Sequence, residues 1–495
     1  MIIIDFFNSS VNWFLNTFGA KRDLLELIKD KDINKAIQSF QCRDTDVENA
    51  ISEYDPESHK VNRRPNKKRI GKPDKITAKL AIPYQRHINE VELTFLYGTM
   101  PTWTQTSTGT DKAFEAFNDF LKNTRWGTTQ REFKRIAGSE TESAKLYYVY
   151  RDTETQETKV GIKVLAKTKG DEIRPLFDQY GNMLSFGHGY YLKEGNNIVR
   201  HFDIYYPDYV FRCTQKNIGW DVITEKNDIG KIPVIYVQQP KSWYGVQALI
   251  DRLEELRSRV SDVNDYVADP ILKMSTDILI AQKEAKMSNT VKSGLPDPDT
   301  SGGGKTVGLP TKDSIMEYLT VDTAVDLKKN EIEDLDKVIK VMTMTPDLTF
   351  EALISAGAPT GRALRRAMAL GYMKRAKNIE IYSIAQDREA NLIKAIIGNI
   401  LNISLKSEME KLIVHSEFGE PFQDDVSEKI SDIIKLRDAG LLSQETAMSL
   451  IDYIKDVQSE MEKVKVELAE KQQALSEQMG AGSLFGQFRN NNNDE

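Results

Sequence analysis

The stretch 302–306 reads Gly-Gly-Gly-Lys-Thr, which has the residue types that end a phosphate-binding loop. In such a loop, backbone amides of glycines surround phosphates, while the lysine and the hydroxyl serve the phosphates and a magnesium ion. The full motif also needs a glycine at position 299 and a buried strand before it. This chain has Asp299 there, after prolines at 296 and 298. We therefore disfavour nucleotide hydrolysis and interpret residues 293–310 as a Gly/Pro-rich loop tip.

Histidines and cysteines are too sparse for an evident metal or redox site. His188 and His201 lie 13 residues apart in a strand-rich region, which favours surface or edge-strand histidines over a metal pair. Cys42 and Cys213 are the only cysteines, too few for a disulfide framework or a cysteine-based zinc site. We expect no catalytic residue, no metal and no cofactor.

One short stretch is strongly basic, although the whole chain is not. Residues 63–72 carry six cations and no acid: Arg63, Arg64, Lys67, Lys68, Arg69 and Lys72. This stretch could touch a phosphate backbone, or it could be a solvated linker or a link to an acidic neighbour. The chain has 67 basic and 74 acidic residues. General attraction to phosphates is therefore excluded, and any contact with nucleic acid must be local.

Two long helical patterns are the elements around which the chain is organised. In residues 245–268, apolar residues recur at alternating steps of three and four, which is a heptad seam: Val246, Leu249, Leu253, Leu256, Val260, Val263 and Val267. A second narrow stripe lies within residues 322–342: Val325, Ile332, Leu335, Ile339 and Met342. Such a stripe requires a partner helix. The two could form an antiparallel hairpin, many copies could line a wall, or this could be an ordinary surface hairpin.

The preceding part of the chain is predicted to be one α+β domain over residues 76–240. Its helices are expected at 76–98, 111–123 and 129–143, and its strands at 145–151, 159–166, 198–206, 209–215, 219–224 and 232–238. Residues 21–60 are predicted to form short helices. Residues 1–18 are apolar but interrupted by polar residues, and no stretch approaches 18 uninterrupted apolar residues. We therefore expect neither a secretory signal nor a membrane span.

The second long helix is followed by a broken segment and then by the longest helical pattern. Pro346, Gly357 and Pro359 interrupt residues 343–359, and a helix is expected over 360–405. Its first half carries cations without an acid: Arg362, Arg365, Arg366, Lys374, Arg375 and Lys377. These could meet DNA or acidic helices of neighbouring subunits, and we favour the neighbours. Further on, we expect a returning strand within 410–418, a helix over 426–438 ended by Gly440, and a helix over 445–455 capped by Ser443.

Four phrases, in order, resemble those of tailed-phage portal proteins of the SPP1-like family. They are Phe-Leu-Tyr-Gly at 95–98, Gly-Lys-Ile-Pro-Val-Ile-Tyr at 230–236 with the helix that follows, Ala-Gly-Ala-Pro-Thr-Gly-Arg-Ala-Leu at 356–364, and Asp-Ala-Gly-Leu-Leu-Ser-Gln-Glu-Thr-Ala at 438–447. The resemblance covers roughly residues 76–455. It implies the portal fold: mainly helical α+β, with an α/β wing, a long-helix stem, a small α/β clip, a tunnel loop and a helical crown.

The resemblance also implies a division of the chain and a set of partners. The parts would be an N-terminal arm (1–75), the wing (76–240), stem helix 1 (241–269), the clip (270–321), stem helix 2 (322–342), the tunnel loop (343–359), a long kinked helix with the rest of the wing (360–426), and a crown with a disordered tail (427–495). Portals of this family form rings, typically of twelve subunits, at one capsid vertex. Double-stranded DNA passes through the ring, and the partners are the terminase large subunit, the major capsid protein and head-completion or adaptor proteins.

On this interpretation the protein is a virion component that assembles in the host bacterial cytoplasm, without a membrane partner. Close contact with DNA is expected in the tunnel loop, at Thr345, Pro346, Asp347, Leu348, Thr349, Phe350, Glu351 and Leu353. Channel-lining candidates in the stem are Lys328, Lys329, Glu333, Asp336, Lys337 and Lys340. Subunit-interface candidates are Leu249, Leu253, Leu256, Val260, Val263, Arg362, Arg365 and Arg366.

Charge supports passage of DNA rather than binding to it. Residues 245–268 hold five acids and three bases, and residues 322–342 hold six acids and four bases. Such walls would weakly repel phosphates and let DNA slide, although the lysines could equally pair with nearby acids. Two rival functions remain: a nuclease or ATPase acting on nucleic acid, and a virion structural or adaptor protein that is not a portal and assembles through long helices.

Overall fold

The structure is a computed structural model that describes residues 24–68, 74, 76–154, 156–268, 272–274, 316–318, 325–347, 367–421, 426–451, 457 and 459–467. Contacts divide the chain into two compact units. The first comprises residues 1–357 and 365–421, and the second comprises residues 358–364 and 422–495. The mixture of helices and sheets confirms the predicted α+β class.

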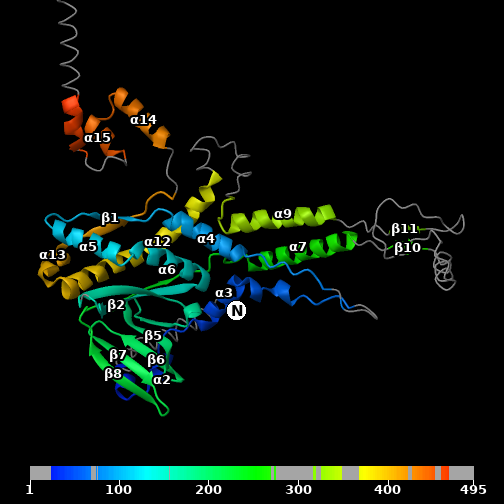
Figure 1. The fold of residues 1–495 in the computed structure, drawn as a ribbon, viewed down its shortest axis with the longest axis horizontal. Coiled ribbons are helices and arrows are strands. Elements are labelled where there is room, and N and C mark those ends of the chain that lie inside the picture. The colour runs from blue at the N-terminus through cyan, green and yellow to red at the C-terminus, as the bar shows by residue number, and fades with distance from the viewer. Residues whose placement is uncertain are drawn as a thin grey trace, which may run out of the picture. The chain divides into compact units, whose positions relative to one another are not determined.

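Helices form much of the first unit (Figure 1). After a helical stretch at 24–29 they are α2 (Ile33–Gln38), α3 (Asp44–Tyr54), α4 (Tyr84–Tyr97), α5 (Asp111–Asn123), α6 (Trp126–Glu140), α7 (Gln247–Ala268), α9 (Val325–Met342), α12 (Ala369–Ile396) and α13 (Lys406–Lys411). Short 3-10 turns are η1 (Pro56–Ser58), η2 (Lys60–Arg63), η3 (Lys167–Lys169) and η5 (Ile403–Leu405), and η4 (Ile397–Leu401) is a π-helical turn. The helices predicted at 111–123, 245–268 and 322–342 are confirmed.

The helix predicted from residue 76 begins only at Tyr84, so its predicted start is wrong. Pro83 occupies the N-cap position, and residues 76–83 have no regular secondary structure. The physical reason lies far away in the sequence. Backbone amides of this segment bond to side chains of α7, so they do not need a helix.

The strands form two antiparallel sheets that contact each other. One has the order β3-β2-β9, built from β2 (Glu142–Arg151), β3 (Thr158–Leu165) and β9 (Val234–Gln238). The other runs in sequence order through β4 (Glu172–Phe177), β5 (Met183–Glu194), β6 (Asn197–Tyr205), β7 (Tyr209–Gln215) and β8 (Trp220–Lys226). The predicted strands are confirmed, but β4 and β5 were not foreseen. Glycines interrupt the alternation in β5, and Gly187 is required there because the ring of Phe202 occupies the space of a Cβ atom.

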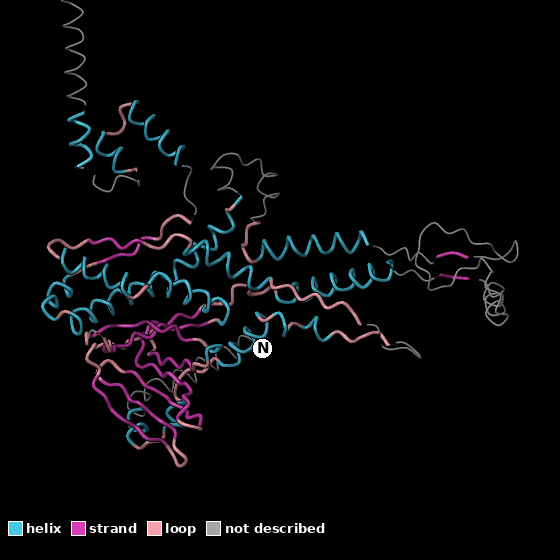
Figure 2. Tube along the Cα trace, in the orientation of Figure 1, coloured by secondary structure: helices cyan, strands magenta, loops and turns pink. Residues whose placement is uncertain are grey.

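Three hydrophobic clusters show that the sheets and helices are layered (Figures 1 and 2). Helices α4, α5, α6 and α12 pack on the β3-β2-β9 sheet through residues such as Phe117, Tyr147 and Ile393. A second cluster, including Leu146 and Phe186, joins the two sheets. The helical stretch at 24–29 and α2 cover the face of the five-stranded sheet that is turned away from the β3-β2-β9 sheet.

Two short strand pairs complete the first unit. Strand β1 (Thr102–Gln105) pairs antiparallel with β12 (Val414–Glu417), which confirms the returning strand. Strand β10 (Leu272–Met274) pairs antiparallel with β11 (Met316–Tyr318). The loop at 302–306 lies outside the described residues.

The second unit is helical where it is described. Helix α14 (Val426–Asp438) is followed by Gly440 with a φ of +73°, and the Oγ atom of Ser443 caps α15 (Gln444–Ser449) by accepting a bond from the Thr446 amide. The predicted end of α14 at Gly440 and the predicted start of α15 after Ser443 are confirmed. Helix α15 itself stops before the predicted residue 455. Among the described helices of both units, none is long and apolar enough to cross a membrane.

Candidate functional site

The long hairpin is defined as α7 and α9, which lie side by side (Figure 2). Residues of the predicted apolar stripes pack between the two helices. Leu253 of α7 and Ile339 of α9 are both fully buried in a cluster that also includes Trp243. Of the predicted interface residues, Leu253 and Leu256 are buried within the single chain, whereas Leu249, Val260 and Val263 are half-buried. The seam therefore serves first as the internal contact of the hairpin.

Helix α7 has a second buried face that is polar. Glu254 and Ser258 are fully buried, although neither belongs to the apolar stripe of the helix. Glu254 Oε1 accepts a bond from the Ile82 amide at 2.7 Å, Ser258 Oγ accepts one from the Leu80 amide at 2.9 Å, and Asp262 Oδ1 accepts one from the Ala78 amide at 2.7 Å. We call residues 76–82 the strap, because this segment runs antiparallel along α7.

The three bonds form a ladder because two different repeats match in length. Four residues of a helix advance about 6 Å. Two residues of extended chain advance about 6.6 Å. Side chains spaced by four on α7 can therefore reach every second amide of the strap. Recognising the ladder from the sequence would have required pairing Glu-x3-Ser-x3-Asp on α7 with a segment more than 170 residues away.

Ion pairs from His59 and Arg64 to α7 lie at the two ends of the ladder. His59 and Glu254 are each 1% exposed, and His59 Nδ1 lies 2.7 Å from Glu254 Oε1. Burial by itself lowers the pKa of His59, but the hydrogen bond and charge of Glu254 raise it above its ordinary value. At the other end, the guanidinium of Arg64 pairs with Asp262 at 3.0 Å and also donates to the Ala78 carbonyl. Arg64 thus links to an acidic element of its own chain.

Two of the predicted channel-lining residues are engaged within the chain. Asp336 accepts bonds from the Tyr84 hydroxyl at 2.7 Å and from Lys340 at 2.8 Å. Lys340 also pairs with Asp347 at 2.8 Å. Burial lowers the pKa of Lys340, but the two carboxylates outweigh it and raise the pKa above its ordinary value.

The other predicted channel residues leave a face of α9 open. Lys329, Glu333 and Lys337 are exposed, and Lys328 is half-buried. Within the described part of the chain, Lys329 and Lys337 make no ion pair. These residues are therefore free to meet a ligand or another subunit.

Only the beginning of the predicted tunnel loop belongs to the described residues. Thr345 and Pro346 are buried, and the Thr345 amide donates to the Lys340 carbonyl at 2.8 Å. Thr343 and Thr345 share a hydroxyl–hydroxyl bond of 2.9 Å. This part is thus folded back onto the end of α9. The remaining predicted loop residues lie outside the described residues: Leu348, Thr349, Phe350, Glu351 and Leu353.

The cations expected to meet DNA or neighbouring subunits are divided. Arg362, Arg365 and Arg366 lie outside the described residues. For Lys374 and Arg375 the expectation is wrong, because both have partners within the chain. Lys374 pairs with Glu92 at 3.0 Å, and Arg375 donates to the Phe418 and Gly419 carbonyls at 2.9 and 2.7 Å.

Two buried charge clusters join α12 to the rest of the first unit. In one, the Glu92 carboxylate contacts Lys134 and Lys374; burial raises its pKa, but the two ammonium groups lower it to about 2. In the other, fully buried Lys145 and the hydroxyl of Tyr147 both contact Glu389. Burial lowers the pKa of Lys145 against the opposing effect of Glu389. These clusters position α12.

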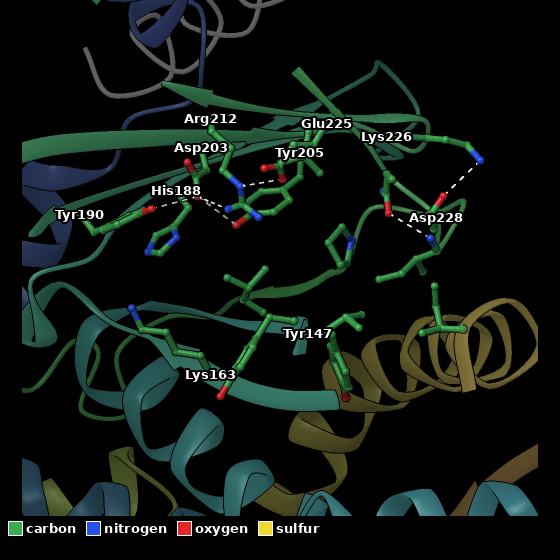
Figure 3. A pocket seen from close by; sticks show the side chains of 18 of the residues that line it. Tyr147, Lys163, His188, Tyr190, Asp203, Tyr205, Arg212, Glu225, Lys226 and Asp228 are labelled. Carbon is green, nitrogen blue, oxygen red and sulfur yellow. Dashed lines mark hydrogen bonds and ion pairs between the residues drawn. The ribbon is translucent and has the colours of Figure 1, made fainter. Parts of the chain in front are cut away.

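A polar pocket of about 540 Å³ lies between the two sheets, with labelled side chains on both walls (Figure 3). His188 is buried there, with Nε2 2.8 Å from Asp171, so its predicted surface or edge-strand location is wrong. Asp203 accepts bonds from Arg212, Tyr190 and Tyr205. The charged groups are thus paired with one another. No group of three or more potential metal ligands occurs among the residues that the structure describes.

Comparisons with known proteins identify the family. The model of a family described as "Phage portal protein, SPP1 Gp6-like" matches residues 43–474. A comparison with curated proteins found no match.

Similar solved structures include the neck of a native gene transfer agent particle computed with C12 symmetry, at 9% identity and a TM-score of 0.41. Another is the virion of a native gene transfer agent particle, at 10% identity and a TM-score of 0.40. Each match covers 74% of this chain and 89% of the other. The family match alone spans most of the sequence and agrees with the resemblance found in its motifs. The chain is therefore a member of the SPP1 Gp6-like family of phage portal proteins.

Proposed function

We propose that the protein forms a closed ring of about twelve subunits at one capsid vertex, with the long hairpin as the stem that lines a channel for double-stranded DNA. In this proposal residues 343–359 form the tunnel loop, 76–240 and 360–426 the wing, 270–321 the clip and 427–495 the crown. The terminase large subunit drives DNA through the ring, which later retains the DNA and docks head-completion or adaptor proteins. The ring contacts the major capsid protein in the virion and assembles in the host cytoplasm.

The observation that carries this proposal is the charge of the long hairpin, in which acids outnumber bases and several of the cations are paired within the chain. Arg252 pairs with Glu331 at 2.9 Å, and Arg259 pairs with Glu255 at 2.6 Å. Each contact between a cation and a phosphate releases counterions and must be broken when DNA moves. Cations that are already paired make such contacts weak. A wall of this kind lets DNA pass.

Subunit contacts in the stem would use the apolar part of α9 that remains exposed. Leu327, Val338 and Val341 are 70%, 41% and 53% exposed. Their spacings of 11 and 3 residues place them on one face of the helix. With the half-buried Val260 and Val263 of α7, they offer a surface for the next subunit, because a closed ring repeats one heterologous contact.

Native mass spectrometry with negative-stain images tests the ring. We expect an assembly of about twelve 56.3-kDa subunits around a central hole. A monomer or dimer that fails to form rings at high concentration, or together with capsid protein, would favour the adaptor function. We further propose a structural rather than catalytic role, and ATP hydrolysis by the purified ring would contradict it.

Packaging assays test the channel. Glu333→Lys should add one cation per subunit to the wall, and packaging should slow at low salt and recover as salt rises. The matched control is Glu115→Lys, which changes an exposed acid of α5. Shortening residues 348–353 should impair packaging or DNA retention while the ring stays intact. Unchanged packaging in Glu333→Lys and in the shortened protein would refute the assignment of the channel.

A further inference from the structure

A small pocket lies where α12 ends and α13 begins. It has a volume of about 330 Å³, and its polar lining includes Lys231, Asn391, Lys394, Asn399, Lys406 and Glu410. The regular helix gives way there to the π-helical turn η4. Such turns are rare and often mark functional sites. The pocket is not needed for the proposed channel, so it raises a separate question about its ligand.

Three lysines gather at this pocket against a single carboxylate, that of Glu410. Within the described part of the chain, none of the three forms an ion pair. Lys231 Nζ donates to the Asn391 carbonyl at 3.1 Å, and Lys394 Nζ donates to the Leu412 carbonyl at 2.9 Å. An ammonium group has three N–H donors, so each of these two retains donors for a ligand.

The positive charges gathered at this pocket are unfavourable to one another. Burial, and then the neighbouring charge of Lys231, lower the pKa of Lys394. An anion in the pocket would offset both the like-charge repulsion and part of the desolvation. The ligand that fits this chemistry is therefore negatively charged.

A second groove continues the pocket and adds apolar surface. This groove, of about 770 Å³, shares Gly398, Asn399 and Lys406 with the pocket and is also lined by Ile403. The side chain of Ile403 is 72% exposed. The two grooves together offer cationic and apolar contacts side by side.

We propose that this double groove binds an acidic, partly apolar polypeptide segment of another protein, whose carboxylates enter the lysine pocket. A duplex is less suitable, because it needs a continuous row of cations, whereas in the second groove Lys226 pairs with Asp228 at 3.1 Å and Asp208 adds an acid. That groove takes the apolar part of the segment, and the carboxylates of the segment stay in the lysine pocket. Phosphates also gain nothing from Ile403. Moreover, Lys394 lies about 30 Å along α12 from Lys374, and Lys374 donates to the Ser242 carbonyl just before the long hairpin begins. The groove therefore serves a protein partner rather than the DNA of the proposed channel.

Fluorescence anisotropy with the full-length protein tests the lysine pocket. The probe is labelled poly-L-glutamate of about 20 residues, and labelled duplex DNA of about 24 base pairs is the comparison. The test variant is Lys231→Gln/Lys406→Gln, which changes exposed side chains only. The control is Lys193→Gln/Lys216→Gln, which removes two exposed lysines that do not line either groove.

With a loss of about threefold per lysine, the test variant should bind polyglutamate about tenfold more weakly, and the control should change less than about twofold. Both variants should keep the native mass of the wild-type assembly. Equal losses in both variants, or none in the test variant, would overturn the proposal. So would duplex DNA that binds as tightly as polyglutamate and loses affinity in the same variant.

A second experiment tests the apolar part of the groove. A peptide that mixes glutamate and leucine should bind more tightly than polyglutamate, and Ile403→Ser should abolish that difference. A difference that persists in Ile403→Ser would contradict the apolar contact with the segment.

Discussion

Replacing Glu254 by glutamine should release the strap from α7. The carboxylate is fully buried and its Oε1 atom accepts bonds from His59 and from the Ile82 amide, each at 2.7 Å. Glutamine retains the size and one acceptor oxygen, but it loses the negative charge and introduces donors. His59 and the Ile82 amide, which already share Oε1, then bond to a weaker, uncharged acceptor in a buried site.

The magnitude follows from the loss of a buried, charge-assisted contact. Such a change costs about 2 kcal/mol, less than complete removal of a buried partner. At about 1.4 kcal/mol per tenfold, the opening equilibrium of the strap should increase about 30-fold. Glu255→Gln is the matched control on the adjacent residue. Glu255 is 40% exposed and pairs with Arg259 at the surface, so its loss should cost less than about 1 kcal/mol.

Hydrogen exchange followed by mass spectrometry measures the opening directly. Amides of residues 76–82 should exchange about 30-fold faster in Glu254→Gln, and less than about fivefold faster in Glu255→Gln. Peptides from the five-stranded sheet should be unchanged in both variants. Equal protection of the strap in wild type and Glu254→Gln, or equal loss in the two variants, would refute the ladder as the attachment of the strap.

Three further predictions concern the same unit. Because the folded-state pKa of His59 is raised above 6.5, its stabilisation is complete below that value and is lost as pH rises through the folded pKa. Strap protection, corrected for intrinsic exchange, should therefore fall as pH rises above 6.5 in wild type but not in His59→Gln. Lys145→Met should cost about 3–5 kcal/mol in urea unfolding, and adding Glu389→Gln should recover part of it; no recovery would argue against the pair. Gly371→Ala places a methyl group against the ring of Phe95 and should cost about 1–3 kcal/mol, which an unchanged melting temperature would contradict.

Much of the secondary structure could be predicted because its signals are local. The seam of α7 follows from apolar spacing, the end of α14 follows from Gly440, and the start of α15 follows from the Ser443 cap. Family membership likewise followed from short phrases in order. These features depend on residues that are close together in the sequence.

The strap and the buried charges could not be predicted, because their partners lie far apart in the sequence. Helical periodicity assigns Glu254 to a solvated face, but His59 and the Ile82 amide, 195 and 172 residues away, compensate for its burial. Lys145 and Glu389 are 244 residues apart, and each alone indicates a surface position. A polar residue in a helical pattern indicates that its side chain needs a hydrogen-bond or ion-pair partner. It does not indicate whether that partner is water or another part of the protein.

The same reasoning changes how the charges of the long hairpin are interpreted. A count of acids and bases treats every charge as available to DNA, yet Asp336 and Lys340 neutralise each other and Glu254 serves the strap. What DNA or a neighbouring subunit can meet is the remainder, such as Glu333 and Lys337, after internal pairing is complete. The charge available at the surface therefore depends on which side chains are already bonded to the strap or within the hairpin. A substitution of such a bonded residue should change the stability of the fold before it changes contact with DNA in the proposed channel.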